Sequence, residues 1–505
     1  MRPALDGYAG IPQETRLLFR GVCMTDFVDV EGLLQTSHNF LASGTANKPM
    51  LGAEPDEQSR LHRYSRVIIS TEAKPSAKRF GMVMRYLKKL RVALALTLSA
   101  LLMPDSRKIS TSWFESRYFE DFVWRTLFAK TLHATDFASV TARNYRICSV
   151  PWNVLQMAGL YSLKFAAKPV YPSLDTSGVD IFIAQTPYPA RIDKTTALVV
   201  RYHDAVPVFM PHTVANKSRH EATHYYALLS NVQSGAYFAC LSEVTRQDLL
   251  RLFPEVKERA VTINCMVSHH FFVEDSSAAH AHQIIRSRLN LLTPKAHPAF
   301  NNIEEQESFY RIHLEMPSVK YLLIVSTIEP RKNHTCLIEA WETIRAEIDH
   351  GIKLVVVGSL GWDIEHIMQK MRTWIDQGEL FILSNVNAAD LRVLYRHAAA
   401  TVCPSFAEGF DFSGVESMRS GGVVIASDIP VHREIYSDAA EYFDPYCTAS
   451  LVGAIKEVLY GQNASQIQER LRVNGNAVSA CYLPENVLPQ WEKFLQHVSQ
   501  ASANQ

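Results

Sequence analysis

The sequence predicts an α/β protein made of two facing domains, each built on an open parallel sheet. The chain has 505 residues, too many for one ordinary hydrophobic core, which suggests two domains of roughly 200–250 residues each. In two regions, short apolar stretches alternate with helix-like stretches, the pattern of successive βα units. A polar, histidine-rich stretch over 274–317 separates the two regions. Two Rossmann-like domains are therefore expected, with ligands bound at the carboxyl ends of their strands.

The first domain is predicted to comprise residues 1–273. Strands are expected over 179–185, 196–204 and 259–267, with a strand end, a Ser or Thr cap and a helix over 241–253. Residues 74–145 are expected to form a mostly helical, aromatic-rich insertion. Only about four residues precede Asp6 and Gly7, so the sheet either begins mid-strand or the start of the chain is set late. The sequence leaves both alternatives open.

The second domain is predicted to comprise residues 318–478. It opens with a buried strand, a loop and an amphipathic helix from Lys320, and further strands are expected over 353–359, 379–386, 399–405 and 422–427. The 274–317 linker is expected to contain one short helix, Gln283 to Leu291. Residues 479–505 are read as a terminal helix that packs back on the first domain.

Composition excludes several classes of function. The 51 basic and 51 acidic residues give a net charge of zero, so nothing global points to nucleic acid. The eight cysteines form no CxxC pair, which disfavours zinc and thioredoxin-like sites and fits a reducing compartment. The N-terminus lacks the apolar core of a signal peptide, so a cytoplasmic location is expected. No metal site and no cofactor beyond a co-substrate are expected.

The segment from Pro404 to Gly422, PSFAEGFDFSGVESMRSGG, carries the most informative chemistry. Glu408 is expected in the loop after a strand, and Glu416 just inside the following helix, which would start at Ser413 or Gly414. Two carboxylates can accept hydrogen bonds from sugar hydroxyls, while free N–H groups at a helix N-terminus favour phosphate. The pattern therefore suits a sugar nucleotide.

This segment resembles the Glu-x7-Glu motif of the family-4 retaining glycosyltransferases, in the form EGFG-x4-E-x2-(A/S)-x-G. The sequence departs from the motif at Asp411, where the family usually has Gly. The resemblance implies the glycosyltransferase B architecture, with Glu408 on the donor hexose and Glu416 on the ribose hydroxyls. It also implies that the loop binds the donor; its residues are Gly409, Phe410, Asp411 and Phe412.

A second element is STIEPRKNH, Ser326 to His334, which follows a predicted strand. Transfer from a nucleoside diphosphate sugar leaves negative charge on two phosphates, which cations stabilise. Arg331 and Lys332 are placed to do so, and the alternative is a pair of solvated loop cations. Related enzymes have a similar stretch in which the lysine, and often an earlier arginine, holds the diphosphate. That arginine would fall near Ser326 and is absent from this sequence. Lys332 is therefore favoured first as the diphosphate-binding residue, and Arg331 second.

A third element is VVRYHDAVP, in which His203 and Asp204 end a strand of the first domain. A histidine at a strand end is often only structural, but one facing a donor can hydrogen-bond a reacting sugar or phosphate. Many members of the family have His-Asp or His-Glu here, which implies that His203 faces the donor. Asp204 is read equally as a site residue or as a cap or turn residue.

Glycines supply weaker signals. Gly7 and Gly10 resemble the Gly-rich turn that the family has after its first strand, with Pro12 expected at the first helical position and Gln13 following. Gly358 follows a strand where the family places the nucleotide base, although a tight turn alone would also explain it. Glu434 matches a common family glutamate and is read as structural.

One segment has the character of a membrane-surface helix. Residues 92–103 are apolar but shorter than the ~20 residues that cross a bilayer. They follow a cluster of basic residues: Lys78, Arg79, Arg85, Lys88, Lys89 and Arg91. Residues 78–103 are read either as a buried helix with a solvated basic end or as a peripheral contact with an anionic membrane.

Together these features predict a retaining hexosyltransferase that uses a nucleoside diphosphate sugar. The acceptor is a hydroxyl of a glycan or a lipid-linked glycan, and a GDP-mannose-like donor is favoured because of a resemblance to bacterial mannosyltransferases of surface polysaccharides. Two alternatives are a sucrose- or trehalose-type synthase and a catalytically silent scaffold of the same fold. The region over 20–175 has no counterpart in the family, and it is expected to shape the acceptor site.

Overall fold

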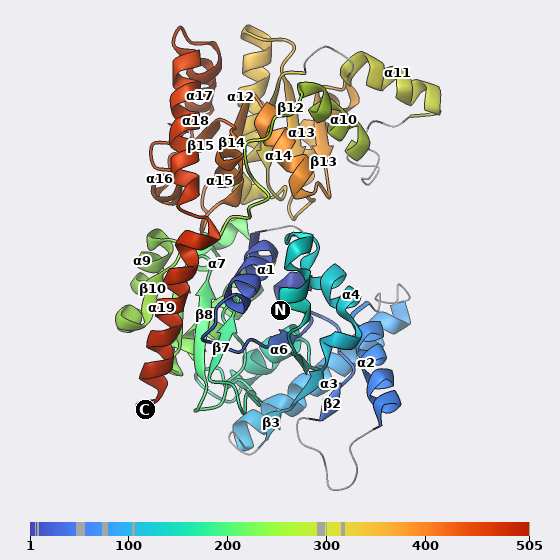
Figure 1. The fold of residues 1–505 in the computed structure, drawn as a ribbon, viewed down its shortest axis with the longest axis vertical. Helices are drawn as coiled ribbons and strands as arrows, with labels where there is room; N and C mark the ends of the chain where they lie inside the picture. Colours follow the sequence, from blue (N-terminus) through green and yellow to red (C-terminus); the bar gives the residue numbers. More distant parts are fainter. Residues whose placement is uncertain are drawn as a thin grey trace.

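The protein consists of two α/β domains stacked along its longest axis (Figure 1). The computed structural model describes residues 1–5, 7, 10–46, 56–72, 79–103, 107–289, 298, 300–314 and 319–503. Asp6, Lys78 and the end of the helix expected up to Leu291 lie outside these residues. The last helix leaves the second domain and runs along the first, so both ends of the chain lie in the first domain.

The second domain contains a six-stranded parallel sheet in the order β13-β12-β11-β14-β15-β16. Its strands are β11 Tyr321–Val325, β12 Lys353–Val357, β13 Leu380–Leu383, β14 Ala400–Cys403, β15 Val424–Ser427 and β16 Ala440–Phe443. Five of the six confirm predicted strands, whereas β16 was not predicted. Its helices are α12 His334–Glu347, α13 Glu365–Asp376, α14 Ala388–His397, α15 Phe412–Arg419, α16 Pro430–Tyr436, α17 Thr448–Tyr460 and α18 Ala464–Ala480.

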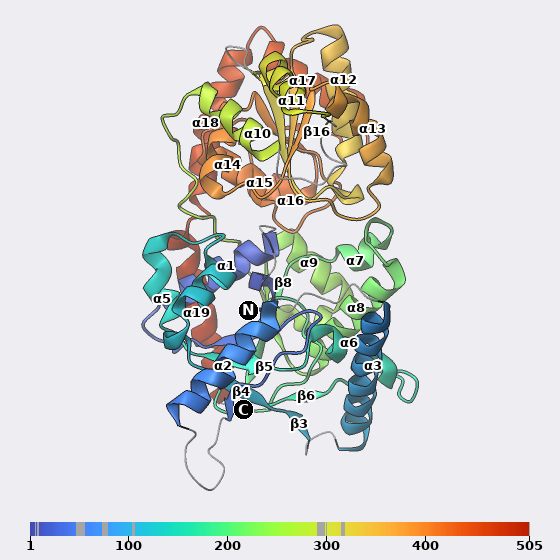
Figure 2. The same ribbon diagram turned by 90° about the vertical axis from the view of Figure 1, so that its right-hand side faces the viewer.

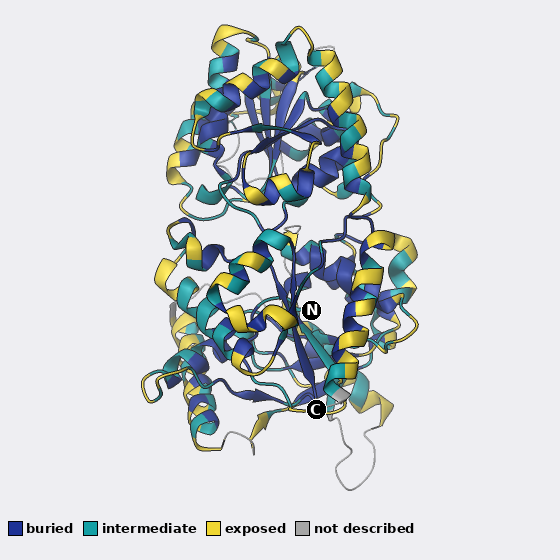
Figure 3. Ribbon diagram, turned by 90° about the vertical axis from the view of Figure 1, so that its left-hand side faces the viewer, coloured by how far each residue is buried: buried dark blue, intermediate teal, exposed yellow. Residues whose placement is uncertain are grey.

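Burial on both faces explains why these strands are continuously apolar. Along β11, Tyr321 and Leu323 pack into one hydrophobic cluster, while Leu322 and Ile324 pack into the cluster on the opposite face. The strands form the buried interior of the domain, and the exposed residues lie on the outer sides of the helices (Figure 3). This is the doubly covered sheet that the alternation of strands and helices predicts.

The first domain contains a second parallel sheet, in the order β10-β9-β8-β7. Its strands are β7 Ile181–Ala184, β8 Ala197–Tyr202, β9 Tyr237–Cys240 and β10 Ala260–Thr262. Its helices are α1 Gly10–Cys23, α6 Trp152–Ser162, α7 Val206–Phe209, α8 Lys217–Gln233 and α9 Glu243–Leu252. Ser242 caps α9, because its hydroxyl accepts from the N–H of Thr245 at 3.2 Å, which confirms the predicted cap.

The region expected to be a helical insertion contains strands as well. Over 74–145 it includes α3 Arg79–Leu102, α4 Glu120–Val123 and α5 Phe137–Thr141, and α2 Glu57–Glu72 precedes it. A mixed sheet in the order β1-β5-β4-β2 joins β1 Gly32–Leu34, β2 Thr45–Ala46, β4 Thr111–Phe114 and β5 Tyr145–Cys148, and β3 Lys108–Ile109 pairs with β6 Ser173–Leu174. Strands this short give little alternation in sequence, so the prediction of a mainly helical insertion was incomplete.

The start of the chain differs from the expectation of a strand. Arg2–Leu5 is a single 3₁₀ turn that leads into α1, and Pro12 is the third residue of α1 rather than the first. Beside it lies a cavity of about 570 Å³ between β7 and β1, lined by residues that include Leu33, Ile181 and Ile183. Because β7 is the last strand of its sheet among the described residues, the cavity lies along its outer edge.

The linker contains two helices instead of the one that was predicted. They are α10 Ala278–Leu289 and α11 Ile303–Leu314. Ile284 and Ile285 of α10 and Tyr310 of α11 are buried in the same hydrophobic cluster as Leu383 of β13. The linker helices therefore belong structurally to the second domain.

The terminal helix, α19 Pro484–Ala503, packs against α1, β7 and β8 of the first domain. Arg201 on β8 and Glu14 on α1 form a fully buried ion pair at 2.7 Å, and Trp491 of α19 stacks over the guanidinium at 5.2 Å. The Arg201 guanidinium also donates to the carbonyl oxygens of Ile263 and Asn264. The predicted return of the terminal helix to the first domain is confirmed.

Replacing Arg201 with Ala should strongly destabilise the protein, because it leaves the Glu14 carboxylate buried without its charge partner. We expect a loss of about 3–5 kcal/mol in the free energy of unfolding, measured by urea denaturation. Arg251→Ala is the matched control, since it removes an exposed ion pair with Asp248 at 3.2 Å and should cost less than about 1 kcal/mol. Equal losses in the two variants would contradict this account.

Candidate active site

The candidate site lies where two loops of the second domain meet at the carboxyl ends of neighbouring strands. One loop follows β11 and forms a 3₁₀ turn, Pro330–Lys332; the other follows β14 and leads into α15. Since β11 and β14 pair in parallel, their following loops leave from the same edge of the sheet. The N–H of Phe406 donates to the carbonyl oxygen of Arg331 at 3.0 Å, which joins the two loops directly.

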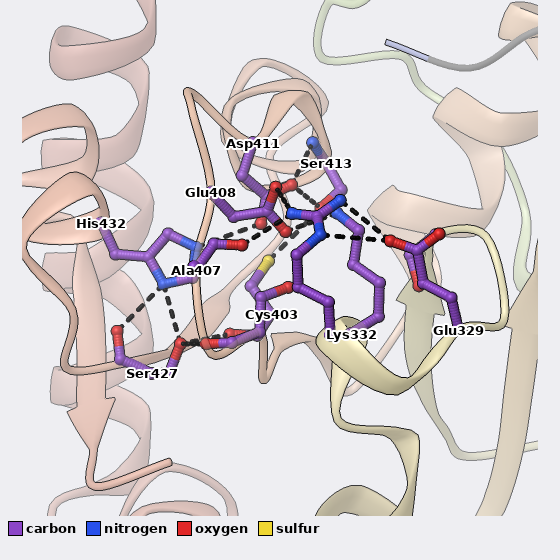
Figure 4. Close-up of polar contacts among 12 residues, drawn as sticks. Glu329, Lys332, Cys403, Ala407, Glu408, Asp411, Ser413, Ser427 and His432 are labelled. Atoms are coloured by element: carbon purple, nitrogen blue, oxygen red, sulfur yellow. Dashed lines mark hydrogen bonds and ion pairs between the residues drawn. The ribbon is translucent and has the colours of Figure 1, made fainter. Parts of the chain in front are cut away.

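Glu408 is held between the two predicted cations (Figure 4). One of its carboxylate oxygens accepts from the Arg331 guanidinium at 2.7 Å, and the other accepts from the Lys332 ammonium. Arg331 also pairs with Glu329 at 3.0 Å and donates to the carbonyl oxygen of Ala407 at 2.6 Å. The structure thus brings together the three residues that the sequence predicted from separate motifs.

The charges of this cluster stabilise one another. Burial by itself raises the pKa of Glu408, but the charges of Arg331 and Lys332 outweigh burial and hold that pKa below its usual value. Burial likewise lowers the pKa of Arg331, but the carboxylates of Glu408 and Glu329 together raise it. Glu408 is therefore an anion that can accept from a hydroxyl, and Arg331 stays charged for phosphate.

Asp411, the departure from the family motif, has a specific partner. Its carboxylate caps α15 by accepting from the N–H of Ser413 at 3.2 Å, and its φ of +64° lies in the left-handed region that favours glycine. Its second oxygen lies 3.2 Å from Nε2 of His432, whose Nδ1 lies 2.9 Å from the carbonyl oxygen of Ser427. Nδ1 also lies 3.1 Å from the hydroxyl of Ser427, so the ring is held between the Asp411 carboxylate and Ser427.

The Asp411–His432 pair changes the electrostatics of the loop. Burial tends to raise the pKa of Asp411, but the hydrogen bond from His432 and the charge of Lys332 hold it well below its usual range. A carboxylate therefore occupies the N-terminus of α15, where free N–H groups would otherwise attract phosphate. His432 and Lys332 lie beside this carboxylate and favour its charged form.

Glu416 is bound from both domains. One carboxylate oxygen accepts from the side-chain amide of Gln13 on α1 at 2.7 Å, and the other accepts from the hydroxyl of Tyr395 on α14 at 3.1 Å. Burial raises the pKa of Glu416 to about 7, against the two hydrogen bonds, which lower it. The second glutamate of the motif thus lies at the contact between the domains and titrates near neutral pH.

His203 reaches the same loop from the first domain. A Cβ at Gly409 would lie 2.0 Å from the carbonyl oxygen of His203, so the two backbones touch and only glycine fits there. Burial, followed by the charge of Arg201, lowers the pKa of His203 to about 3, so the ring is neutral. Its Nε2 is buried and has no hydrogen-bond partner among the described residues. Asp204 accepts from the N–H of Val206 at 3.0 Å, as a turn residue does.

The structure also places the remaining residues that the sequence predicted for the site. Gly10 and Phe412 meet across the domains, because a Cβ at Gly10 would lie 3.3 Å from the Phe412 ring. Gly358, which follows β12, lies close to the end of the neighbouring strand β11. A Cβ at Gly358 would lie 1.9 Å from the carbonyl oxygen of Ser326. The Phe410 side chain packs in the hydrophobic core instead of lining the site, with its ring against Tyr482. Gly7 has open space around it.

Glu434 has the structural contacts expected of it. Its two carboxylate oxygens accept from the backbone N–H groups of Glu243 and Val244, at 2.6 and 2.9 Å. These are the first two residues of α9 in the other domain, where a negative charge is favourable. Glu434 therefore joins the two domains away from the Glu408 cluster.

Sequence reasoning missed the partners of the motif residues. Tyr395 and His432 carry no local signal, because each reaches the site from a different helix. Gln13 was noted only as the residue after Pro12, and its contact with Glu416 spans 403 positions. The EPRKN stretch held the one available clue, since Glu329 precedes its own partner Arg331 by two residues.

Comparison with known proteins agrees with this geometry. Residues 306–477 match the family described as glycosyl transferases group 1. The chain is 31% identical over 175 residues to the serotype-specific mannosyltransferase WbdA of Escherichia coli, which is 34% of this chain and 21% of that protein. It is 33% identical over 125 residues to the O-antigen chain mannosyltransferase B of Escherichia coli, which is 25% of this chain and 33% of that protein.

A solved structure shows weaker likeness over a longer stretch. It is sucrose-phosphate synthase of Thermosynechococcus elongatus, with 17% identity and a TM-score of 0.48, covering 73% of this chain and 85% of that one. The chain spans only about a fifth to a third of the length of the two curated relatives named above. The family match falls on the domain that carries Arg331, Lys332, Glu408 and Glu416. Residues 306–477 therefore resemble the group 1 glycosyl transferases, and part of the chain resembles bacterial mannosyltransferases.

Proposed function

We propose that the protein is a retaining glycosyltransferase that moves a hexose from a nucleoside diphosphate sugar to a hydroxyl of a glycan or lipid-linked acceptor. The observation that carries the proposal is the cluster in which Glu408 lies between Arg331 and Lys332, with Glu416 in the helix that follows. Such a cluster offers an acceptor for sugar hydroxyls beside two permanent cations. A catalytically inactive scaffold would not need cations and carboxylates held together at the carboxyl ends of two neighbouring strands.

In the proposed reaction, the acceptor oxygen bonds to the anomeric carbon on the face that the diphosphate leaves. The bond between that carbon and the phosphate oxygen breaks, and its electron pair goes to the phosphate. The acceptor proton passes to the same phosphate oxygen. Arg331 and Lys332 stabilise the charge that develops there, and Glu408 orients the hexose by accepting from its hydroxyls.

Binding of the donor requires the cluster to rearrange. In the structure the Glu408 carboxylate pairs with both Arg331 and Lys332, and the side-chain amide of Gln13 donates to the Glu416 carboxylate. Phosphate oxygens would replace Glu408 as partners of Arg331 and Lys332, and ribose hydroxyls would replace the Gln13 amide. The proposed donor thus exchanges existing hydrogen bonds for new ones, which limits the desolvation cost of binding.

The favoured donor is GDP-mannose. The support is the similarity of part of the chain to relatives that are named mannosyltransferases, two of them of O-antigen chains. By the same argument, the proposed acceptor is a growing surface polysaccharide. We also propose that transfer needs no bound metal ion, so that EDTA should leave the turnover of the purified protein unchanged.

The proposed activity is tested with a panel of nucleotide sugars that includes GDP-mannose, UDP-glucose and UDP-N-acetylglucosamine. Release of the nucleoside diphosphate is measured with and without glycan acceptors, and NMR of the product reports the anomeric configuration. We expect turnover of GDP-mannose with retention. If no donor binds or is turned over, the enzyme proposal is overturned. An inverted product would overturn the retaining mechanism.

Lys332→Ala should lower kcat roughly 10²–10³-fold, because it removes one of two cations aimed at the leaving phosphate. The matched control is Lys353→Ala, which removes a lysine with similar exposure, 12% against 14%, that is paired with Glu379 outside the site. The control should retain its kcat. A loss of turnover that is equal in both variants would indicate destabilisation and would count against the proposed role of Lys332.

Affinity for the nucleoside diphosphate should fall as the pH drops through about 7. Glu416 has a raised pKa of about 7, so it is ionised above that pH and protonated below it. The ionised carboxylate is the form that accepts from two ribose hydroxyls. Calorimetric titration with GDP from pH 6 to 8 measures this effect, and Glu416→Gln should bind more weakly and with a flat profile. If Glu416→Gln keeps the wild-type dependence of affinity on pH, another titrating group is responsible for it.

A further inference from the structure

Helix α3 presents an apolar stripe to solvent along most of its length. Seven of its large apolar side chains lie within one face of a 3.6-residue helix: Phe80, Val83, Met84, Leu87, Leu94, Leu98 and Leu102. All seven are exposed, from 45% for Leu94 to 78% for Phe80. The opposite face, with Ala93, Thr97 and Ala100, is buried, and the Thr97 hydroxyl donates to the carbonyl oxygen of Ala158 on α6 at 3.0 Å.

This arrangement differs from the buried helix that was one reading of the sequence. The buried residues of α3 are small, while Leu87, Leu94, Leu98 and Leu102 are exposed. Figure 2 shows α3 at the outer edge of the first domain, beside α6 and α8. An exposed apolar surface of this extent marks an interaction site more often than a solvated face.

The surroundings of the stripe are basic. Helix α3 contains no Asp or Glu, and its first half contains Arg85, Lys88, Lys89 and Arg91. Burial, followed by the charges of Arg85 and Arg219, lowers the pKa of Lys89, which places the start of α8 beside this half. Lys217 and Arg219 on α8 are exposed, and Glu221 is the acidic residue of that helix.

The end of α6 extends the same surface. Burial and then Tyr86 of α3 raise the pKa of Tyr161, so the last turn of α6 lies against the first half of α3. Just beyond that turn, Phe165 is 72% exposed and is flanked by the exposed Lys164 and Lys168. The apolar side chains and cations of this surface thus come from α3, from the turn after α6 and from the start of α8.

We propose that this surface docks the protein peripherally on an anionic membrane, with the apolar side chains of α3 in the headgroup region and the cations on the lipid phosphates. Among the described residues, no helix is long and apolar enough to cross a membrane. A helix with an apolar face and a basic margin lies in the plane of the interface instead. The basic margin selects anionic lipid over an apolar protein partner, because cations strengthen binding at a negative surface.

The position of the surface fits the proposed acceptor. Helix α8 begins directly after Pro211–Thr213, and the carbonyl oxygen of Thr213 accepts from the indole of Trp362 in the second domain at 3.0 Å. The basic half of α3 therefore lies towards the end of the first domain that contacts the second domain. Docking there would bring a lipid-linked acceptor to the donor site. The membrane contact itself does not depend on the proposed reaction.

The test is co-sedimentation of the whole protein with vesicles of phosphatidylglycerol or of phosphatidylcholine alone. We expect strong partitioning to the first and little to the second. The triple variant Lys88→Glu, Lys89→Glu and Arg91→Glu should lower partitioning roughly a hundredfold. The triple variant Leu94→Gln, Leu98→Gln and Leu102→Gln keeps every cation and should still lower it about tenfold or more.

The matched control reverses three cations elsewhere: Arg251→Glu, Lys257→Glu and Lys493→Glu. It makes the same change in net charge, so it should keep most of the binding. Circular dichroism and donor hydrolysis in detergent-free buffer report whether each variant is folded. Equal binding to both vesicles, unchanged binding of the α3 variants, or an equal loss in the control would overturn the membrane proposal. None of these outcomes bears on the proposed transfer reaction.

Discussion

The order of strands in the second sheet is the constraint on which the site depends. Strands β12 and β13 follow β11 to one side, and β14, β15 and β16 continue on the other, so the direction of winding reverses between β11 and β14. At such a reversal the connections to the next helices leave on opposite faces, and the two loops open a crevice at the strand ends. The EPRKN loop and the EGFD loop are those two connections.

Once the two loops meet there, charge balance sets the details. Glu408, Glu329 and Asp411 bring three buried carboxylates to a small volume, which is stable only because cations are paired with them. Arg331 pairs with Glu329 and Glu408, Lys332 pairs with Glu408, and Nε2 of His432 lies 3.2 Å from the Asp411 carboxylate. The substitution of Asp for the glycine of the motif is therefore compensated by a histidine from the following helix.

The first domain contributes to the site through backbone and amide contacts. His203 and Gly409 touch through their backbones, Gly10 lies against the Phe412 ring, and Gln13 binds Glu416. Glu434 and the terminal helix α19 join the domains elsewhere. A donor bound between the domains would therefore alter contacts made by both, which links its binding to the position of one domain relative to the other. The exposed face of α3 lies on this same first domain.

The sequence alone determined the two parallel sheets, because strands buried on both faces must be continuously apolar and the intervening helices must be amphipathic. It also singled out Arg331, Lys332 and Glu408 in loops that follow strands, and Glu416 in the helix after Glu408, because these stretches have a recognisable spacing. Tertiary structure alone decided that Gln13, Tyr395 and His432 join them, because these contacts depend on where distant elements pack. The same holds for the outer face of α3: its apolar run is visible in sequence, but only packing against α6 decides which side remains in solvent.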